Sequence, residues 1–151
     1  MPMKTIEPFL ISLLAAVAHI GAAHALCLDP KSGISGYKFP LRSEIHSAEA
    51  IVVGRVLAEN ALKEDRSDPY GVSAYEVTIK AQAILKGRLP NVFSVRNENT
   101  SARYAMSVGE EHVLFISQGR DGQLWINSCG NSSMGSKGND LVNQIQAELQ
   151  K

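Results

Sequence analysis

The sequence has no excess of charge, few aromatic residues and few cysteines. Its 151 residues carry 15 basic and 15 acidic side chains, so the formal net charge is zero. Nucleic-acid-binding proteins owe much of their affinity to basic side chains that neutralise phosphates. Because this chain has neither a basic excess nor a basic run, nucleic acid is not expected among its partners.

The chain also lacks the short motifs of common catalytic sites. It contains no Gly-rich phosphate loop followed by lysine, no Gly-x-Ser-x-Gly and no His-Glu-x-x-His. His46 and His112 show no spacing typical of a zinc site, so each is expected to be an ordinary surface or satisfied histidine. Glu110 and Glu111 beside His112 could imitate an acid–base cluster, but adjacent strand residues point to opposite faces. We therefore predict no catalytic residue, no metal and no cofactor.

The longest apolar run lies near the start of the chain. Phe9 to Ala18 follows Lys4 and falls short of the ~20 residues that span a bilayer. Ala23-His24-Ala25 matches the small-x-small pattern of signal-peptide cleavage. We predict that residues 1–25 are a signal peptide cleaved after Ala25, which leaves no stable membrane anchor. The mature protein would be secreted or periplasmic.

Residues 26–151 are expected to form a single domain that starts with an arm and ends with a helix. Residues 26–40 are rich in glycine and proline and should form an ordered surface arm. Apolar residues at offsets of four and three predict a short helix over Leu41–Ala48. Residues 139–150 carry one apolar stripe, which predicts an amphipathic helix. The composition of residues 131–138 is that of a flexible linker.

Apolar patterns between these helices predict strands. Ala50–Leu57 is β-branched and apolar on both sides, as in a buried strand, and a charged exposed loop follows over Asn60–Gly71. Tyr75–Leu85 alternates with a period of two and is long enough that it must coil, with Ala81 and Ala83 at the tightest curvature. Val92–Arg96 would return as its partner.

The segment from Tyr104 to Gly130 predicts a hairpin that ends at Cys129. Val113–Ile116 and Leu124–Ile126 are its strands, and Gly119–Gly122 supplies the turn. Trp125, like Phe39, is expected to anchor the core. Five strands without a βαβ pattern predict a mainly all-β fold, a five-stranded closed antiparallel barrel of the OB type, with a two-sheet sandwich as the alternative.

Cys27 and Cys129 are the only cysteines, and two cysteines in an exported chain are usually paired. We therefore predict a disulfide between the arm and the end of the hairpin. In the alternative, a cysteine acts as a nucleophile or metal ligand, and it would then need a nearby histidine.

Several short motifs occur together in a distinctive order. They are Ala48–Val56, Tyr75–Val77 leading into Leu85-Lys86-Gly87, Val108–Phe115 and Ser128–Gly130. In this respect the chain resembles bacterial members of the tissue inhibitor of metalloproteinases (netrin-like) superfamily. The resemblance implies an exported OB-type barrel with flanking helices and an amino-terminal cysteine bonded to one near the end of the barrel, the positions of Cys27 and Cys129.

The chain departs from the animal inhibitors at the residues that chelate zinc in them. Leu26 precedes Cys27, which displaces the free amine by one residue, and Asp29 stands where the second cysteine of a Cys-x-Cys pattern would lie. Inhibition of a zinc protease through a chelating amino terminus is therefore not expected, while insertion of the arm into another kind of cleft remains open.

The leading hypothesis is an exported, non-enzymatic OB-like module that binds a protein or an envelope component through its arm and barrel loops. Its candidate contact residues are Leu26, Cys27, Leu28, Asp29 and Tyr37 in the arm and Tyr70, Asn99 and Tyr104 in the loops. The second hypothesis is a periplasmic hydrolase or protease inhibitor or a metal-handling protein. The third is a small enzyme that uses His112 with Glu110 or Glu111.

Overall fold

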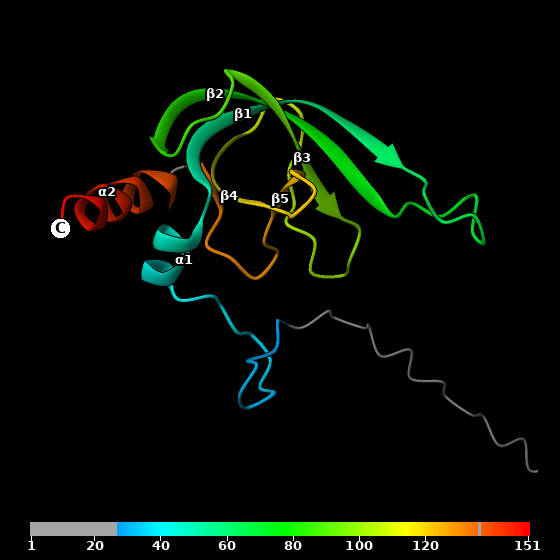
Figure 1. Cartoon of the computed structure of the whole chain (residues 1–151), viewed down its shortest axis with the longest axis horizontal. Coiled ribbons are helices and arrows are strands. Elements are labelled where there is room, and N and C mark those ends of the chain that lie inside the picture. Colours follow the sequence, from blue (N-terminus) through cyan, green and yellow to red (C-terminus); the bar gives the residue numbers. More distant parts are fainter. Residues whose placement is uncertain (1–26, 136) are drawn as a thin grey trace, which may run out of the picture.

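In the described part of the chain, five strands close into a barrel and two helices pack against one side of it (Figure 1). The computed structural model describes residues 27–135 and 137–151. The predicted leader and Leu26 lie outside the described residues. In chain order the elements are α1 (Leu41–Ser47), β1 (Ala50–Leu62), β2 (Ala74–Lys86), β3 (Val92–Glu98), β4 (Glu111–Gln118), β5 (Leu124–Ile126), β6 (Ser133–Met134) and α2 (Lys137–Leu149).

The barrel order is β1-β2-β3-β5-β4, and it closes because β1 pairs with both β2 and β4. Four of the five contacts around the ring are antiparallel, and the fifth is a parallel bridge between Arg96 in β3 and Trp125 in β5. The predicted closed barrel is confirmed, but it is mixed rather than antiparallel. An odd number of strands cannot alternate in direction all the way around a ring, so one neighbouring pair must be parallel.

Strands β1 and β2 bend where the sequence predicts curvature. Ala83 pairs with Val53 and Ala81 pairs with Gly54, so Gln82 between them has no partner and forms a bulge. A side chain at Gly54 would come within 2.5 Å of the Ile79 side chain, and the missing Cβ allows the strands to pack closely. The small residues at this point therefore allow the long ribbon to coil around the core.

Strand β1 runs further than its apolar residues alone indicate. It extends to Leu62, which pairs with Ala74, and so it includes the start of the predicted charged loop. Pairing with β2 supports these polar residues in an extended conformation beyond the barrel. The remaining loop, residues 63–73, lies at the end of a two-stranded ribbon that projects away from the barrel (Figure 1).

The apolar core has two parts on opposite faces of the strands. The first fills the barrel and includes Val52, Ile79, Val95 and Leu114. The second lies between the barrel and the helices, where Ile45 of α1 and Ile145 of α2 pack with Phe115 of β4. Residues 113–116 of β4 are all buried because both faces of this strand are covered.

The prediction of a flexible linker over residues 131–138 is wrong for its first half. Ser133 and Met134 form β6, which pairs with Val113 and His112 of β4. The neighbouring Ser132 is buried, and its Oγ accepts a 3.0 Å hydrogen bond from the Phe115 amide. A sequence of serine and glycine has no apolar pattern, so this strand depends on a free edge of β4 that local composition does not reveal.

Lys86 connects the end of β2 to the end of helix α1. Its Nζ donates hydrogen bonds of 2.8, 2.7 and 2.6 Å to the carbonyl oxygens of Ile45, His46 and Ala48, respectively. A cation suits these positions because the last carbonyls of a helix lack intrahelical donors. Gly87 follows with φ +78°, and a side chain there would overlap the Glu49 carbonyl oxygen. Lys86 and Gly87 thus both allow α1 to pack against the end of β2.

Replacing Lys86 should detach the end of α1 from the barrel. In the Lys86→Met variant we expect the free energy of unfolding to fall by about 2 kcal/mol, because three carbonyls lose a charged donor while the aliphatic stem is kept. Lys80→Met is the matched control, since Lys80 is exposed on the same strand. Urea denaturation of both variants measures the difference, and equal stabilities would contradict the capping role.

Candidate functional site

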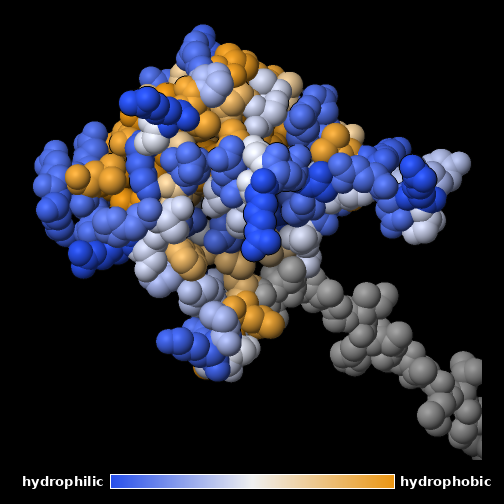
Figure 2. Space-filling view, viewed as in Figure 1, coloured by the Kyte–Doolittle hydropathy of each residue, from blue (hydrophilic) through white to orange (hydrophobic). Residues whose placement is uncertain are grey.

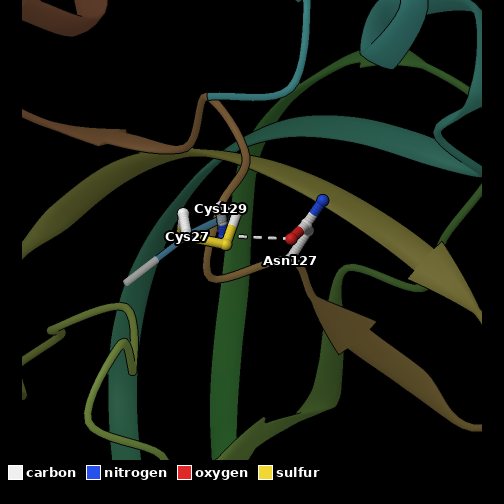
Figure 3. Close-up of a disulfide and its surroundings, with 3 residues drawn as sticks. All are labelled: Cys27, Asn127 and Cys129. Carbon is white, nitrogen blue, oxygen red and sulfur yellow. Dashed lines mark hydrogen bonds between the residues drawn. A yellow bond between two sulfur atoms is a disulfide. The ribbon is translucent and has the colours of Figure 1, made fainter. Parts of the chain in front are cut away.

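The disulfide predicted from the sequence is present. Cys27 and Cys129 are bonded, with their Cα atoms 5.5 Å apart across a sequence separation of 102 residues. The Cys129 amide also donates a 2.9 Å hydrogen bond to Asn127 Oδ1, and Figure 3 shows this contact at the turn that follows β5. The covalent bond therefore fixes the start of the arm to the turn that follows β5.

Both ends of the arm are held at Cys129. One end is held by the disulfide of Cys27, and the other by the Phe39 amide, which donates a 2.9 Å hydrogen bond to the Cys129 carbonyl. The Tyr37 amide donates to the Cys27 carbonyl at 2.8 Å, and Leu28 forms an antiparallel bridge with Ser35. The arm is therefore a closed loop with a narrow base, consistent with the ordered arm predicted from the sequence.

Asp29 shapes the turn inside this loop. Its Oδ1 accepts hydrogen bonds from the amides of Ser32 and Lys31 at 2.9 and 2.7 Å. These two backbone donors, Ser32 first, lower the pKa of the carboxyl group. Asp29 is thus engaged with its own backbone, and its structural role accounts for its presence in the arm.

The apolar side chains that the arm offers to solvent are Leu28 and Ile34. Their exposed fractions are 54% and 68%, high for large aliphatic residues. In Figure 2 apolar surface appears on the arm below the barrel, next to polar residues. Tyr37, another predicted contact residue, is only partly exposed at the base of the loop. Sequence reasoning missed Ile34, although it lies between two turn-forming glycines.

A buried carboxylate locks the base of the arm to α1. Glu44 Oε2 accepts hydrogen bonds of 2.7 Å from both the amide and Nδ2 of Asn131, and Nδ2 also donates to the Phe39 carbonyl. Burial raises the pKa of Glu44, and the two Asn131 donors oppose that shift. A side chain at Gly130 would overlap Glu44 Oε1. The arm base, α1 and the segment after Cys129 are therefore one connected unit.

The predicted loop residues do not form one surface. Tyr70 is 87% exposed on the ribbon loop, and Asn99 Nδ2 donates a 2.8 Å hydrogen bond to the Val72 carbonyl at the base of that loop. The ribbon loop and the arm project in different directions from the barrel (Figure 1). Tyr104 belongs to neither group, because its hydroxyl lies 2.9 Å from His112 Nδ1.

Tyr104, His112 and Glu110 form a cluster, in which the sequence had indicated a pairing of His112 with Glu110 or Glu111 but not the contact with Tyr104. His112 is 1% exposed, and its Nε2 lies 3.3 Å from Glu110 Oε2 without forming a hydrogen bond. Glu110 and His112 are two positions apart and reach the same side, whereas Glu111 is exposed and lies 3.7 Å from Arg55. The acidic neighbour of His112 is therefore Glu110.

Burial sets the protonation of this cluster. It lowers the pKa of His112, and the contact with Glu110 only partly offsets the shift. Burial, together with the Glu110 charge, raises the pKa of Tyr104 far above its ordinary value. Near neutral pH the phenol and the imidazole are therefore both uncharged, and a hydrogen bond joins them at Nδ1.

An open pocket of about 620 Å³ lies beside this cluster. Tyr104 and Glu110 form part of its wall, and His112 lies behind them. The opposite part of the wall is the segment after Asn131, so the pocket adjoins the base of the arm. Its lining residues are Tyr104, Ala105, Ser107, Glu110, Ser132, Ser133, Met134 and Gly135.

Within residues 27–135 and 137–151, no group of three or more histidine, cysteine, aspartate and glutamate side chains is arranged to hold a metal ion. The sequence matches neither a model of a known protein family nor a curated protein. In the described chain, neither helix has the length and apolar character needed to cross a bilayer.

The buried imidazole should make stability depend on pH. Because the folded state lowers the pKa of His112, the unfolded state binds the proton first, and stability should fall as pH drops below about 6.5. The loss should level off once the pH is below the folded-state pKa. Urea denaturation from neutral to mildly acidic pH measures this slope. His112→Gln should remove it, whereas His46→Gln, at an exposed site, should retain it; equal slopes in the two variants would contradict this assignment.

Loss of the disulfide should destabilise the barrel as well as the arm. For a closed loop of about 100 residues, the chain-entropy contribution reaches about 4.7 kcal/mol, and we expect Cys27→Ala/Cys129→Ala to lose up to that amount. Urea denaturation checks the loss, and faster hydrogen exchange at the Tyr37 amide would show that the arm has opened. Unchanged exchange would mean that hydrogen bonds alone hold the loop.

Proposed function

We propose that the protein is an exported, non-enzymatic binding module of the netrin-like type, which recognises a protein or an envelope component through its arm and the loops beside it. The observation that carries the proposal is the arm itself, a loop closed at its base by a disulfide, with Leu28 and Ile34 exposed on it. Such a loop binds without first becoming ordered, so less free energy is lost on association.

The disulfide and the cleavage motif both support export. Disulfides persist in oxidising compartments and are rare in the cytosol, so the Cys27–Cys129 bond agrees with a periplasmic or secreted location. The sequence motif at Ala23–Ala25 supplies the matching leader. The motif Leu85-Lys86-Gly87 contributes to the netrin-like resemblance. In the structure its lysine and glycine allow α1 to pack against the end of β2.

A hydrolase or protease inhibitor is the second candidate. Rigid loops that insert into an enzyme cleft bind tightly because they are ordered before association. The arm has this character, since its base is fixed by the disulfide and by the Glu44–Asn131 hydrogen bonds. This candidate differs from the first only in the partner, so the same variants test both.

A catalytic role for His112 has weaker geometric support. The imidazole is buried behind Tyr104 and Glu110, and it does not line the neighbouring pocket. A substrate in that pocket would meet the glutamate and the phenol first. Loss of a turnover activity in Glu110→Gln, with an unchanged fold, would reverse the non-enzymatic assignment.

The arm hypothesis predicts that polar substitutions on the loop abolish capture without altering the barrel. Immobilised Leu28→Ser/Ile34→Ser protein should lose at least about tenfold in affinity for a partner purified from envelope extract by the unmodified protein. Val92→Ser is the control, because Val92 is similarly exposed but lies on β3. Retained affinity in the double variant, or an equal loss in the control, would exclude the arm as the contact surface.

A further inference from the structure

The single tryptophan of the chain lies on the outer surface, not in the core. Trp125 is 40% exposed, which corrects the expectation that it anchors the core. Its neighbours Leu124 and Ile126 pack against the barrel interior, so the alternation of β5 directs Trp125 outward. A large aromatic surface exposed to water costs hydration free energy, and a ligand that covers it would recover that cost.

Trp125 is the only large apolar residue in a pocket of about 310 Å³ that is otherwise polar. The pocket lies where β3 and β5 meet through the parallel bridge between Arg96 and Trp125. Every other lining residue except a glycine is charged or carries an amide. The lining residues are Arg96, Glu98, Gly119, Asp121, Gln123 and Trp125.

The polar wall of this pocket is held in place before any ligand binds. Arg96 donates to both oxygens of Glu64 at 2.8 and 2.6 Å and also to Glu98, so its guanidinium is fixed at the base. On the other side, Asp121 Oδ1 accepts a 3.0 Å hydrogen bond from the Gln123 amide. A side chain at Gly119 would come within 2.6 Å of that oxygen, so the turn leaves room for the carboxylate.

The charges of the pocket identify the class of ligand. Arg96 is already paired with two carboxylates, and Asp121 adds another, so the surroundings favour no anion. An apolar peptide would need further apolar contacts, which the lining does not provide. A neutral sugar ring fits both the exposed indole and the polar lining. Its C–H face packs on an aromatic ring, and its hydroxyls donate to carboxylates and exchange hydrogen bonds with an amide.

We propose that the pocket around Trp125 binds a neutral saccharide, with the sugar ring stacked on the indole and its hydroxyl groups held by Asp121 and Gln123. Arg96, which pairs with Glu64 and Glu98, forms another part of the lining. The site does not use the arm. It therefore adds a second ligand to the proposed function, and the saccharide proposal does not depend on that function.

The experiment uses the tryptophan as its own reporter. Because the chain has one tryptophan, its fluorescence reports on this site alone. Titration with chito-, cello- and malto-oligosaccharides should produce a saturable change with at least one series, and the affinity should be insensitive to salt because the ligand is uncharged. No saturable change with any of the three series would overturn the proposal, as would tighter binding of an anionic heparin oligosaccharide.

Variants place the ligand within the pocket. Asp121→Asn should lower the affinity for the saccharide by about tenfold. Asp140→Asn, the same change at an exposed position of α2, should leave that affinity unchanged. Trp125→Ala should abolish binding measured by calorimetry, and its folding is checked by urea denaturation, since the residue lies outside the core. Equal affinities in the two aspartate variants would refute the site.

The arm variant separates this inference from the proposed function. Leu28→Ser/Ile34→Ser protein should bind the saccharide as the unmodified protein does, even where it loses its partner. Simultaneous loss of both ligands in that variant, with an unchanged fold, would show that the tryptophan pocket is not an independent site.

Discussion

The pairing of strand β1 with β4 is the constraint on which the rest of the structure depends, because it closes the barrel. Strand β1 pairs with β2 along its length and with β4 over Ala50–Arg55, and this double pairing converts a sheet into a ring. The interior of the ring buries one apolar face of β1, and the helices cover the other. With the core closed in this way, the arm, the ribbon loop and the seam between β3 and β5 are left to present side chains to solvent.

Polar groups at the edges of this barrel connect its separate parts. Lys86 fixes the end of α1, and Glu44 with Asn131 fixes the base of the arm to the same helix. Buried polar groups need their partners, since an unpaired member would lose hydration without compensation. Near the pocket, the Tyr104 hydroxyl serves His112 Nδ1 in the same way. These contacts give the outer elements definite positions relative to the core.

The sequence predicts the elements whose signals are local, and it fails where the signal lies in a partner strand. Alternation locates β2, and the small residues Ala81 and Ala83 locate its bend, because both depend on neighbouring positions. Strand β6 could not be recognised, since Ser133 and Met134 become a strand only beside β4. The outward direction of Trp125 was available from the period of two, but its size suggested the core. The contact of Tyr104 with His112 requires the loop between them to fold back, which no spacing rule describes.

The shape of the arm has a consequence for engineering and for divergence within related chains. Both ends of the loop converge on one residue, Cys129, through the disulfide and the Phe39 amide, so residues between them can be exchanged without moving the strands. An arm of different length or composition could be attached at the same two points, the disulfide and the Phe39 amide. The barrel thus provides two fixed attachment points, between which a grafted peptide could be displayed in a constrained conformation.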